Sequence, residues 1–325
     1  MTKVVVVSTG GTIASRVDRE RGFVTSRASG TELVGLLPQP TAVAVEVDDF
    51  VMVGSFLFDL DLVFRLTQRI AAHLDDPAVA GVVVTQGTDT MEESVFMADL
   101  LIDSDKPVVF TGAQRHADEL DSDGPRNLGD AIKVAAAPEA RGLGAMIVFE
   151  QELHAARDVT KVHAARVGTF ASAEHGKLGE VDGERVIVHR RPTLRRVIAA
   201  ERIEPRVDLV KLVMGSDGRF IDHAVADGAQ AIVLEAFGRG NATLAVVDAV
   251  RRATANGVLV LVTTRCPQGR VLPVYGNGGG KDLVATGAVF AGDLSGIKAR
   301  ILLAVLLAGG RSRSEVIDLV SAMAG

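Results

Sequence analysis

Short runs of β-branched residues, each separated by a helical pattern, constrain the fold of this 325-residue chain more than any other feature. Residues 4–7 and 82–84 are all valine, as in strands of a parallel sheet that helices cover on both faces. Between them, residues 59–73 repeat apolar side chains at three- and four-residue spacing, with Asp59 as the predicted N-cap. The chain is therefore predicted to have an α/β fold.

The alternation of strands and helices is interrupted once, at an arginine-rich stretch. We predict a larger N-terminal domain at 1–189, with a mainly parallel sheet flanked by helices, and a smaller C-terminal α/β domain at 208–325. Residues 190–207 form the predicted linker. Short glycine-punctuated alternation at 175–189 predicts a hairpin, and the run Gly278-Gly279-Gly280 is expected to be a flexible loop.

Composition excludes several classes of function. The net charge of -6 and the absence of a basic block argue against nucleic acid and against anionic membranes as partners. No stretch has the ~18 apolar residues that a membrane span requires, and no signal segment is expected before the first strand. The single cysteine, Cys266, fits a reducing compartment, so we predict a cytoplasmic protein with a packed thiol. A small-molecule ligand is favoured.

Two threonine-containing turns follow the first and third predicted strands, at residues 8–12 and 85–90. Ligands of open α/β sheets bind at strand carboxyl ends, which favours a functional site at these turns. Gly10 and Gly11 allow the main chain to approach a ligand, but a threonine hydroxyl such as that of Thr12 needs a neighbouring base to act as a nucleophile. An ordinary strand-to-helix turn remains an alternative, and no nucleotide-binding glycine motif is present.

Carboxylates and a lysine accompany these hydroxyls. Asp89 follows Thr88 directly, and an N-cap role for Asp89 remains an equal alternative to a chemical one. Glu92 and Glu93 open the next predicted helix, where carboxylates favourably complement the helix dipole. Lys161 lies in a polar segment, and a lysine acts as a base only after losing its proton, which desolvation or a neighbouring cation favours.

Taken together, these motifs resemble those of bacterial-type L-asparaginases. The matching segments are Thr-Gly-Gly-Thr-Ile-Ala at 9–14, Gln-Gly-Thr-Asp-Thr-Met-Glu-Glu at 86–93 and Asp-Val-Thr-Lys at 158–161. Supporting matches at 54–55, 107–112, 123–128 and 238–241 extend the resemblance over essentially the whole chain. The resemblance is closer to the cytosolic, type I branch of the family.

This resemblance implies an enzyme that hydrolyses L-asparagine to L-aspartate and ammonia, with glutamine as a weaker substrate. Thr12 would attack the amide carbon and form an acyl-enzyme, while Thr88, Asp89 and Lys161 would handle protons. The implied substrate-binding residues are Ser55, Phe56, Asp89, Asn241, Gly11 and Gly87. No metal and no cofactor are expected, and the family forms homodimers or homotetramers, in which Asn241 would serve an adjacent subunit.

Two aromatic residues depart from the family pattern. Phe23 occupies the lid-loop position where a tyrosine is usual, and the only tyrosine of the chain, Tyr275, lies far away in sequence. Phe56 follows Ser55 where many members have glutamine, which removes a polar contact to the substrate carboxylate. The segment 266–280 also lacks a glutamate that some secreted members supply.

Two other functions remain open from the sequence. The first is an ammonia-supplying subunit of a tRNA amidotransferase, although such subunits usually carry an added N-terminal domain. The second is a non-catalytic amino-acid sensor, because Phe23 and Phe56 weaken two expected polar contacts. The seven histidines have no metal-ligand spacing and are expected at the surface, and Asn241 alone would also suit a helix N-cap.

Overall fold

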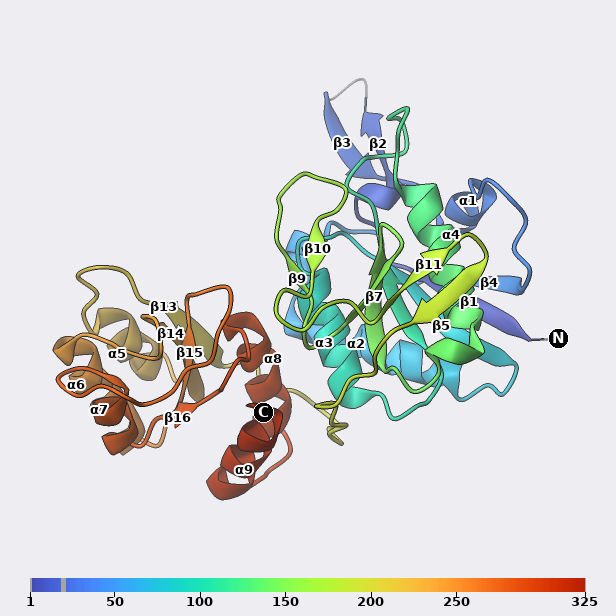
Figure 1. Cartoon of the computed structure of the whole chain (residues 1–325). Helices are drawn as coiled ribbons and strands as arrows, with labels where there is room; N and C mark the ends of the chain where they lie inside the picture. Colours follow the sequence, from blue (N-terminus) through green and yellow to red (C-terminus); the bar gives the residue numbers. More distant parts are fainter. Residues whose placement is uncertain (1, 19–21, 325) are drawn as a thin grey trace. The chain divides into compact units, whose positions relative to one another are not determined.

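The chain forms two compact units, Met1–Val197 and Ile198–Gly325 (Figure 1). In this computed structural model the described residues are 2–18 and 22–324, with only the backbone described for Phe23. The division between the units falls within the segment 190–207 that was predicted as a linker. Each unit is built on its own sheet.

The first unit contains an eight-stranded sheet in the order β12-β11-β8-β7-β6-β5-β1-β4. Neighbouring strands from β4 to β7 run parallel, whereas β8, β11 and β12 add antiparallel pairs at one end. This confirms the mainly parallel sheet. The strands are β1 (Lys3–Ser8), β4 (Ala44–Asp49), β5 (Val79–Thr85), β6 (Val108–Thr111), β7 (Ala145–Phe149), β8 (Glu152–Ala155), β11 (Gly179–Asp182) and β12 (Arg185–Val188).

Helices cover both faces of this sheet. Val4 and Val6 of β1 share one buried cluster with residues of α1 and α4, while α2 and α3 pack against the opposite face (Figure 1). Alternate strand residues point to opposite faces, so the continuous valine runs are buried on both sides. The helices are α1 (Gly30–Gly35), α2 (Leu60–Leu74), α3 (Met91–Leu101) and α4 (Gly124–Ala136).

Local sequence signals confirm several predicted elements of the first unit. The carboxylate of Asp59 accepts a hydrogen bond from the Leu62 N–H at 2.7 Å, as an N-cap should. Pro125 occupies the first turn of α4, where its missing N–H leaves no helical bond unmade. The predicted hairpin is formed by β11 and β12, which pair antiparallel from Gly179 to Val188.

Four short strands of the first unit lie outside the main sheet and were not predicted. The two-residue strands β9 (Thr160–Lys161) and β10 (Phe170–Ala171) pair with each other, as do β2 (Ser15–Asp18) and β3 (Phe23–Ser26). Such short pairs carry almost no periodicity, so sequence patterns cannot identify them. Both pairs contribute to the site described below.

The second unit has a four-stranded parallel sheet, which confirms the smaller C-terminal α/β domain. Helices α5 and α6 share a buried cluster with one face, and α8 packs on the sheet beside α9. The strands are β13 (Val207–Lys211), β14 (Ala231–Ala236), β15 (Leu259–Thr264) and β16 (Val289–Phe290). The helices are α5 (Arg219–Ala226), α6 (Leu244–Ala255), α7 (Gly280–Ala285), α8 (Gly296–Leu307) and α9 (Arg313–Ala324).

Two features of the second unit differ from the sequence-based expectation. Gly278 and Gly279 do lie in a loop, but Gly279 is the N-cap of α7 and Gly280 is the first residue of that helix. All three glycines are buried, and a Cβ on Gly279 would lie 2.2 Å from the Tyr275 carbonyl oxygen, so tight packing explains this run. The thiol of Cys266 is exposed rather than packed.

Among the described residues, no helix combines the length and the apolar character needed to cross a membrane.

One histidine contradicts the expectation that histidines lie at the surface. His154 on β8 is 2% exposed, and its Nδ1 lies 3.0 Å from the Ser172 hydroxyl oxygen. Burial lowers the pKa of His154 from its ordinary 6.5 to about 4, although the nearby Glu152 carboxylate opposes this shift. The folded chain therefore resists a proton that the unfolded chain takes up.

This burial predicts a loss of stability in acid. The contribution of His154 is fully present above pH 6.5 and is lost as the pH falls towards 4, by about 3 kcal/mol in total. We expect His154→Asn to reduce the pH dependence of the free energy of unfolding by that order between pH 7 and 4, as measured by urea denaturation. His189→Asn, at an exposed position, is the control for replacing a histidine by asparagine as such. If the free energy of unfolding of wild type and of His154→Asn changed equally between pH 7 and 4, a lowered pKa of His154 would be contradicted.

Candidate functional site

The two threonine-containing turns lie side by side at the carboxyl edge of the main sheet. Strand β1 pairs with β4 on one side and with β5 on the other, so the strand order changes direction at β1. Hydrogen bonding continues beyond the strands, from the Thr9 N–H to the Thr85 carbonyl at 3.0 Å and from the Val53 N–H to the Thr9 carbonyl at 3.2 Å. This is the topological position where such sheets bind ligands.

Two glycines bring the turns into direct backbone contact. A Cβ on Gly11 would lie only 2.3 Å from the Gly87 nitrogen, and Gly11 has a φ of +83°, which side chains rarely adopt. A Cβ on Gly87 would in turn lie 2.6 Å from the Ser55 hydroxyl oxygen. The three predicted residues Gly11, Gly87 and Ser55 therefore meet, and no side chain fits between them.

Thr12 begins a short 3-10 helix, Thr12–Ala14, immediately after this contact, and it is partly exposed. The carbonyl oxygen of Gly11 accepts three hydrogen bonds, from the Ala14 N–H at 3.0 Å and from the hydroxyls of Ser15 and Ser26 at 2.8 and 3.0 Å. These bonds hold the peptide before Thr12 in a single orientation. Thr12 is thus held at the edge of the sheet by a hydrogen-bonded turn.

Thr88, Asp89 and Lys161 form a connected group. The Lys161 ammonium donates to the Thr88 hydroxyl at 2.8 Å and to the Asp89 carboxylate at 2.7 Å. The Lys161 side chain is 15% exposed and that of Asp89 is 57% exposed, so the carboxylate faces solvent while the lysine is largely enclosed. Asp89 is not an N-cap, because α3 begins after Thr90. The structure thus brings together the three residues predicted to handle protons.

Ser55 connects the loop after β4 to the second turn. Its hydroxyl accepts the Asp89 N–H at 3.2 Å, and its carbonyl accepts the Thr90 hydroxyl at 2.9 Å. Phe56 follows it in the short 3-10 helix Ser55–Leu57, and its side chain is 72% exposed. The structure therefore places Phe56, which the sequence predicted as a substrate-binding residue, beside Ser55 with its ring facing solvent.

Glu92 is a residue whose position the sequence did not reveal. It was expected to complement the dipole of α3, yet it is only 6% exposed and its carboxylate accepts the Lys161 backbone N–H at 3.0 Å. In the sequence, Glu92 is a carboxylate four residues after Thr88. Carboxylates are common at helix N-termini, so the sequence gives no sign that this one contacts Lys161.

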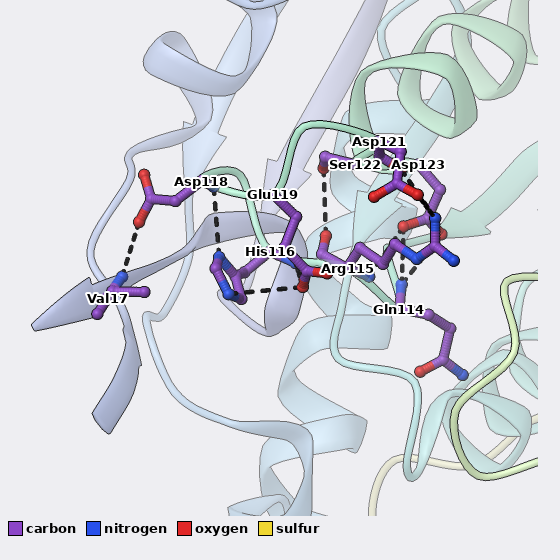
Figure 2. A network of polar contacts seen from close by, with 9 residues as sticks. All are labelled: Val17, Gln114, Arg115, His116, Asp118, Glu119, Asp121, Ser122 and Asp123. Carbon is purple, nitrogen blue, oxygen red and sulfur yellow. Dashed lines mark hydrogen bonds and ion pairs between the residues drawn. The ribbon is translucent and has the colours of Figure 1, made fainter. Parts of the chain in front are cut away.

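The hairpin of β2 and β3 contains the predicted lid position, Phe23, whose side chain lies outside the described residues. Figure 2 shows how the hairpin is fastened to a neighbouring loop, with the Val17 N–H donating to the Asp118 carboxylate at 2.8 Å. That loop is closed by Asp123, whose carboxylate accepts the N–H groups of Gln114 and Arg115. The hairpin is therefore held along β2 by a hydrogen-bonded loop.

Asn241 and Tyr275 belong to the second unit. Asn241 closes a tight turn in which its N–H donates to the Phe237 carbonyl at 2.9 Å, and the N-cap of α6 is Thr243 instead. Tyr275 is exposed. Across the described residues, no group of three or more histidine, cysteine or acidic side chains is arranged to hold a metal ion.

Comparison with known proteins agrees with the two-part α/β fold. Residues 3–194 match the family model described as Asparaginase, N-terminal, and residues 206–319 match the Glutaminase/Asparaginase C-terminal domain. An L-asparaginase of Bacillus licheniformis is 36% identical over 307 residues, covering 94% of this chain and 95% of the relative. A glutamyl-tRNA(Gln) amidotransferase component of Methanosarcina acetivorans is 31% identical, covering 90% of this chain and 71% of the relative. Among solved structures, a probable cytoplasmic L-asparaginase of Campylobacter jejuni superposes with a TM-score of 0.89, with 26% identity and 99% coverage of both chains.

The contact between the turns predicts a large cost for adding one methyl group. Gly11→Ala combines an unfavourable φ with a clash against backbone that cannot move aside, whereas Gly176→Ala in the same unit has a similar φ of +71° and open space. We expect the free energy of unfolding to fall by roughly 1 kcal/mol for Gly176→Ala and by about 1 to 3 kcal/mol more for Gly11→Ala. Urea denaturation measures both, and equal losses would show that the turns do not constrain each other.

Proposed function

This chain belongs to the asparaginase family, and we propose that it hydrolyses the side-chain amide of L-asparagine to L-aspartate and ammonia. The observation that carries the proposal is the bond of 2.8 Å between the Lys161 ammonium and the Thr88 hydroxyl, in a turn packed directly against the one that presents Thr12. Acyl transfer requires a nucleophile and a group that accepts its proton; two hydroxyls and a lysine, which can act as a base once it has lost its own proton, lie together at this sheet edge.

In the proposed first step, the Thr12 oxygen attacks the amide carbon, forms a C–O bond and gives up its hydroxyl proton. The C–N bond then breaks, the leaving nitrogen takes up one proton in exchange and departs as ammonia, and an aspartyl ester of Thr12 remains. Water hydrolyses the ester, which releases aspartate and restores the threonine hydroxyl. Backbone N–H groups of the glycine turns would stabilise the oxyanion of each step.

Lys161 and Thr88 would carry the protons of both steps. Their contact lies within the distance over which a proton passes directly between two groups. Asp89 would serve two purposes, since its carboxylate binds the Lys161 ammonium and also has an exposed side that can receive the α-ammonium group of the substrate. Ser55, whose hydroxyl adjoins Gly87, would bind the α-carboxylate.

Asn241 would complete the site in an assembly of several copies. We propose a homodimer or homotetramer in which Asn241 of one copy binds substrate held by Thr12 and Asp89 of another. Light scattering after gel filtration tests the assembly, and mixing inactive Thr12→Ala with inactive Asn241→Ala subunits should restore activity if the residues act across subunits. No restored activity in mixed oligomers would place Asn241 in its own subunit's site or outside it.

A second candidate is an ammonia-supplying component of a tRNA amidotransferase, which the similarity to the Methanosarcina acetivorans protein favours. The acyl chemistry would be shared, but the preferred amide would be glutamine and ammonia release would depend on a partner and charged tRNA. Comparing turnover of L-asparagine and L-glutamine by the chain alone separates the two functions. L-asparagine and L-glutamine differ by one methylene, and a binding pocket discriminates such a difference by only ~1 to 3 kcal/mol. A non-catalytic sensor would bind asparagine without consuming it.

We predict that the purified chain releases ammonia from L-asparagine and that Thr12→Ala and Lys161→Met each lower kcat by roughly 10³-fold or more, because residues that act as one unit fail together. Thr41→Ala is the matched control. Its hydroxyl is also hydrogen-bonded, to the Val43 carbonyl at 2.7 Å, but it precedes β4 and so lies at the opposite edge of the sheet. A folded protein that releases no ammonia from either amide would refute the proposed function, and full activity in Thr12→Ala would refute the assigned nucleophile.

A further inference from the structure

We propose that Glu92 is a positioning residue, which holds the main chain of Lys161 so that its ammonium group reaches Thr88. The proposal deepens the proposed function, on which the role of Lys161 rests. It stands on three features of the described residues: the weak anchoring of the strand that carries Lys161, the burial of Glu92, and the geometry that joins them.

The strand that carries Lys161 has little support of its own. Strand β9 is only two residues long and pairs with the equally short β10 outside the main sheet. A long, flexible lysine on such a strand loses rotamer entropy when its ammonium is fixed, and motion of the backbone would add to that cost. The position of Lys161 therefore needs a further anchor.

Glu92 supplies that anchor from α3. Its Oε1 accepts the Lys161 backbone N–H at 3.0 Å, while Thr88 and Asp89, four and three residues earlier, bind the ammonium of the same lysine. One five-residue segment thus holds Lys161 at both ends. The separation between the Lys161 backbone and the Thr88 hydroxyl is set by how the chain turns into α3.

Stabilisation of the helix dipole does not account for Glu92. Glu92 and Glu93 both lie in the first turn of α3, and a carboxylate in that turn complements the helix dipole without needing to be buried. Glu92 is nevertheless 6% exposed, whereas Glu93 is only partly buried. The Oε2 of Glu92 is buried and has no hydrogen-bond partner within the described part of the chain, so this carboxylate is held at a cost in solvation. A requirement for the Glu92 contact to position Lys161 would explain why this unfavourable burial is retained.

Three variants separate positioning from general stability. Glu92→Gln keeps an oxygen that can accept the Lys161 N–H, Glu92→Leu has a similar size without any acceptor, and Glu93→Leu removes the neighbouring carboxylate from the same helix turn. We expect Glu92→Leu to lower kcat for asparagine roughly 10- to 100-fold, as a misplacement of about 1 Å does, with KM changed less than about twofold. Glu92→Gln and Glu93→Leu should retain kcat within about threefold.

The reactivity of Lys161 provides a readout that does not depend on hydrolysis. Acetic anhydride labelling of each variant, quantified by peptide mass spectrometry relative to Lys133, reports the environment of the Lys161 amine. We expect the ratio to rise in Glu92→Leu, since the released lysine becomes more accessible, and to stay unchanged in Glu92→Gln. Failure of the wild type to hydrolyse any amide would refute the proposed function while this ratio still tested the positioning.

Several outcomes would overturn the proposal. An unchanged labelling ratio and kcat in Glu92→Leu would show that Lys161 needs no anchor. Equal losses in Glu92→Gln and Glu92→Leu would show that the charge matters and the hydrogen-bond acceptor does not. Equal losses in Glu92→Leu and Glu93→Leu would restore the helix-dipole explanation. If Glu92→Leu does not fold, Glu92→Met replaces it in each comparison, because methionine is also apolar but more flexible.

Discussion

The backbone contact between Gly11 and Gly87 is the constraint on which the arrangement of the site depends. The turns after β1 and β5 approach so closely that a single methyl group on either glycine would meet backbone or the Ser55 hydroxyl. Within the sheet, side chains point away from the neighbouring strand, but a Cβ on Gly11 would point at the adjacent turn and one on Gly87 at Ser55, so both positions require glycine. The positions of Thr12 and Thr88 follow from this contact.

The two halves of the site differ in how they are supported. Thr12 and Thr88 follow central strands of the main sheet, so the surrounding core holds them rigidly. Lys161 comes from a short peripheral strand and depends on bonds to the segment that begins α3. This division suits acyl transfer, in which reacting groups must be prepositioned within a fraction of an ångström. It also explains why a buried carboxylate lies beside a lysine that needs placement.

Features that depend on residues nearby in the sequence were predictable, whereas features that depend on distant residues were not. The strands, Asp59 as an N-cap and Pro125 at the start of α4 were predictable, because each depends on neighbours within a few residues. The burial of His154 and the exposure of Cys266 were misjudged, and the contact of Glu92 with Lys161 was missed, since these features depend on segments distant in the chain. The tight packing of the run at Gly278 to Gly280 was missed for the same reason. Its glycines are required by contacts with residues such as Tyr275 and not by flexibility.

The sequence by itself determined the α/β class, the separation into a larger and a smaller part, and the identity of the residues at the strand ends, because periodicity and turn chemistry are local properties. Only the tertiary structure decided that the Lys161 ammonium reaches Thr88 and Asp89, which lie 73 and 72 residues earlier in the chain. It alone also placed the two threonine turns on adjacent strands at the point where strand order reverses. The pairing of strands and the burial of a carboxylate are set by packing of the whole unit, which no local pattern encodes.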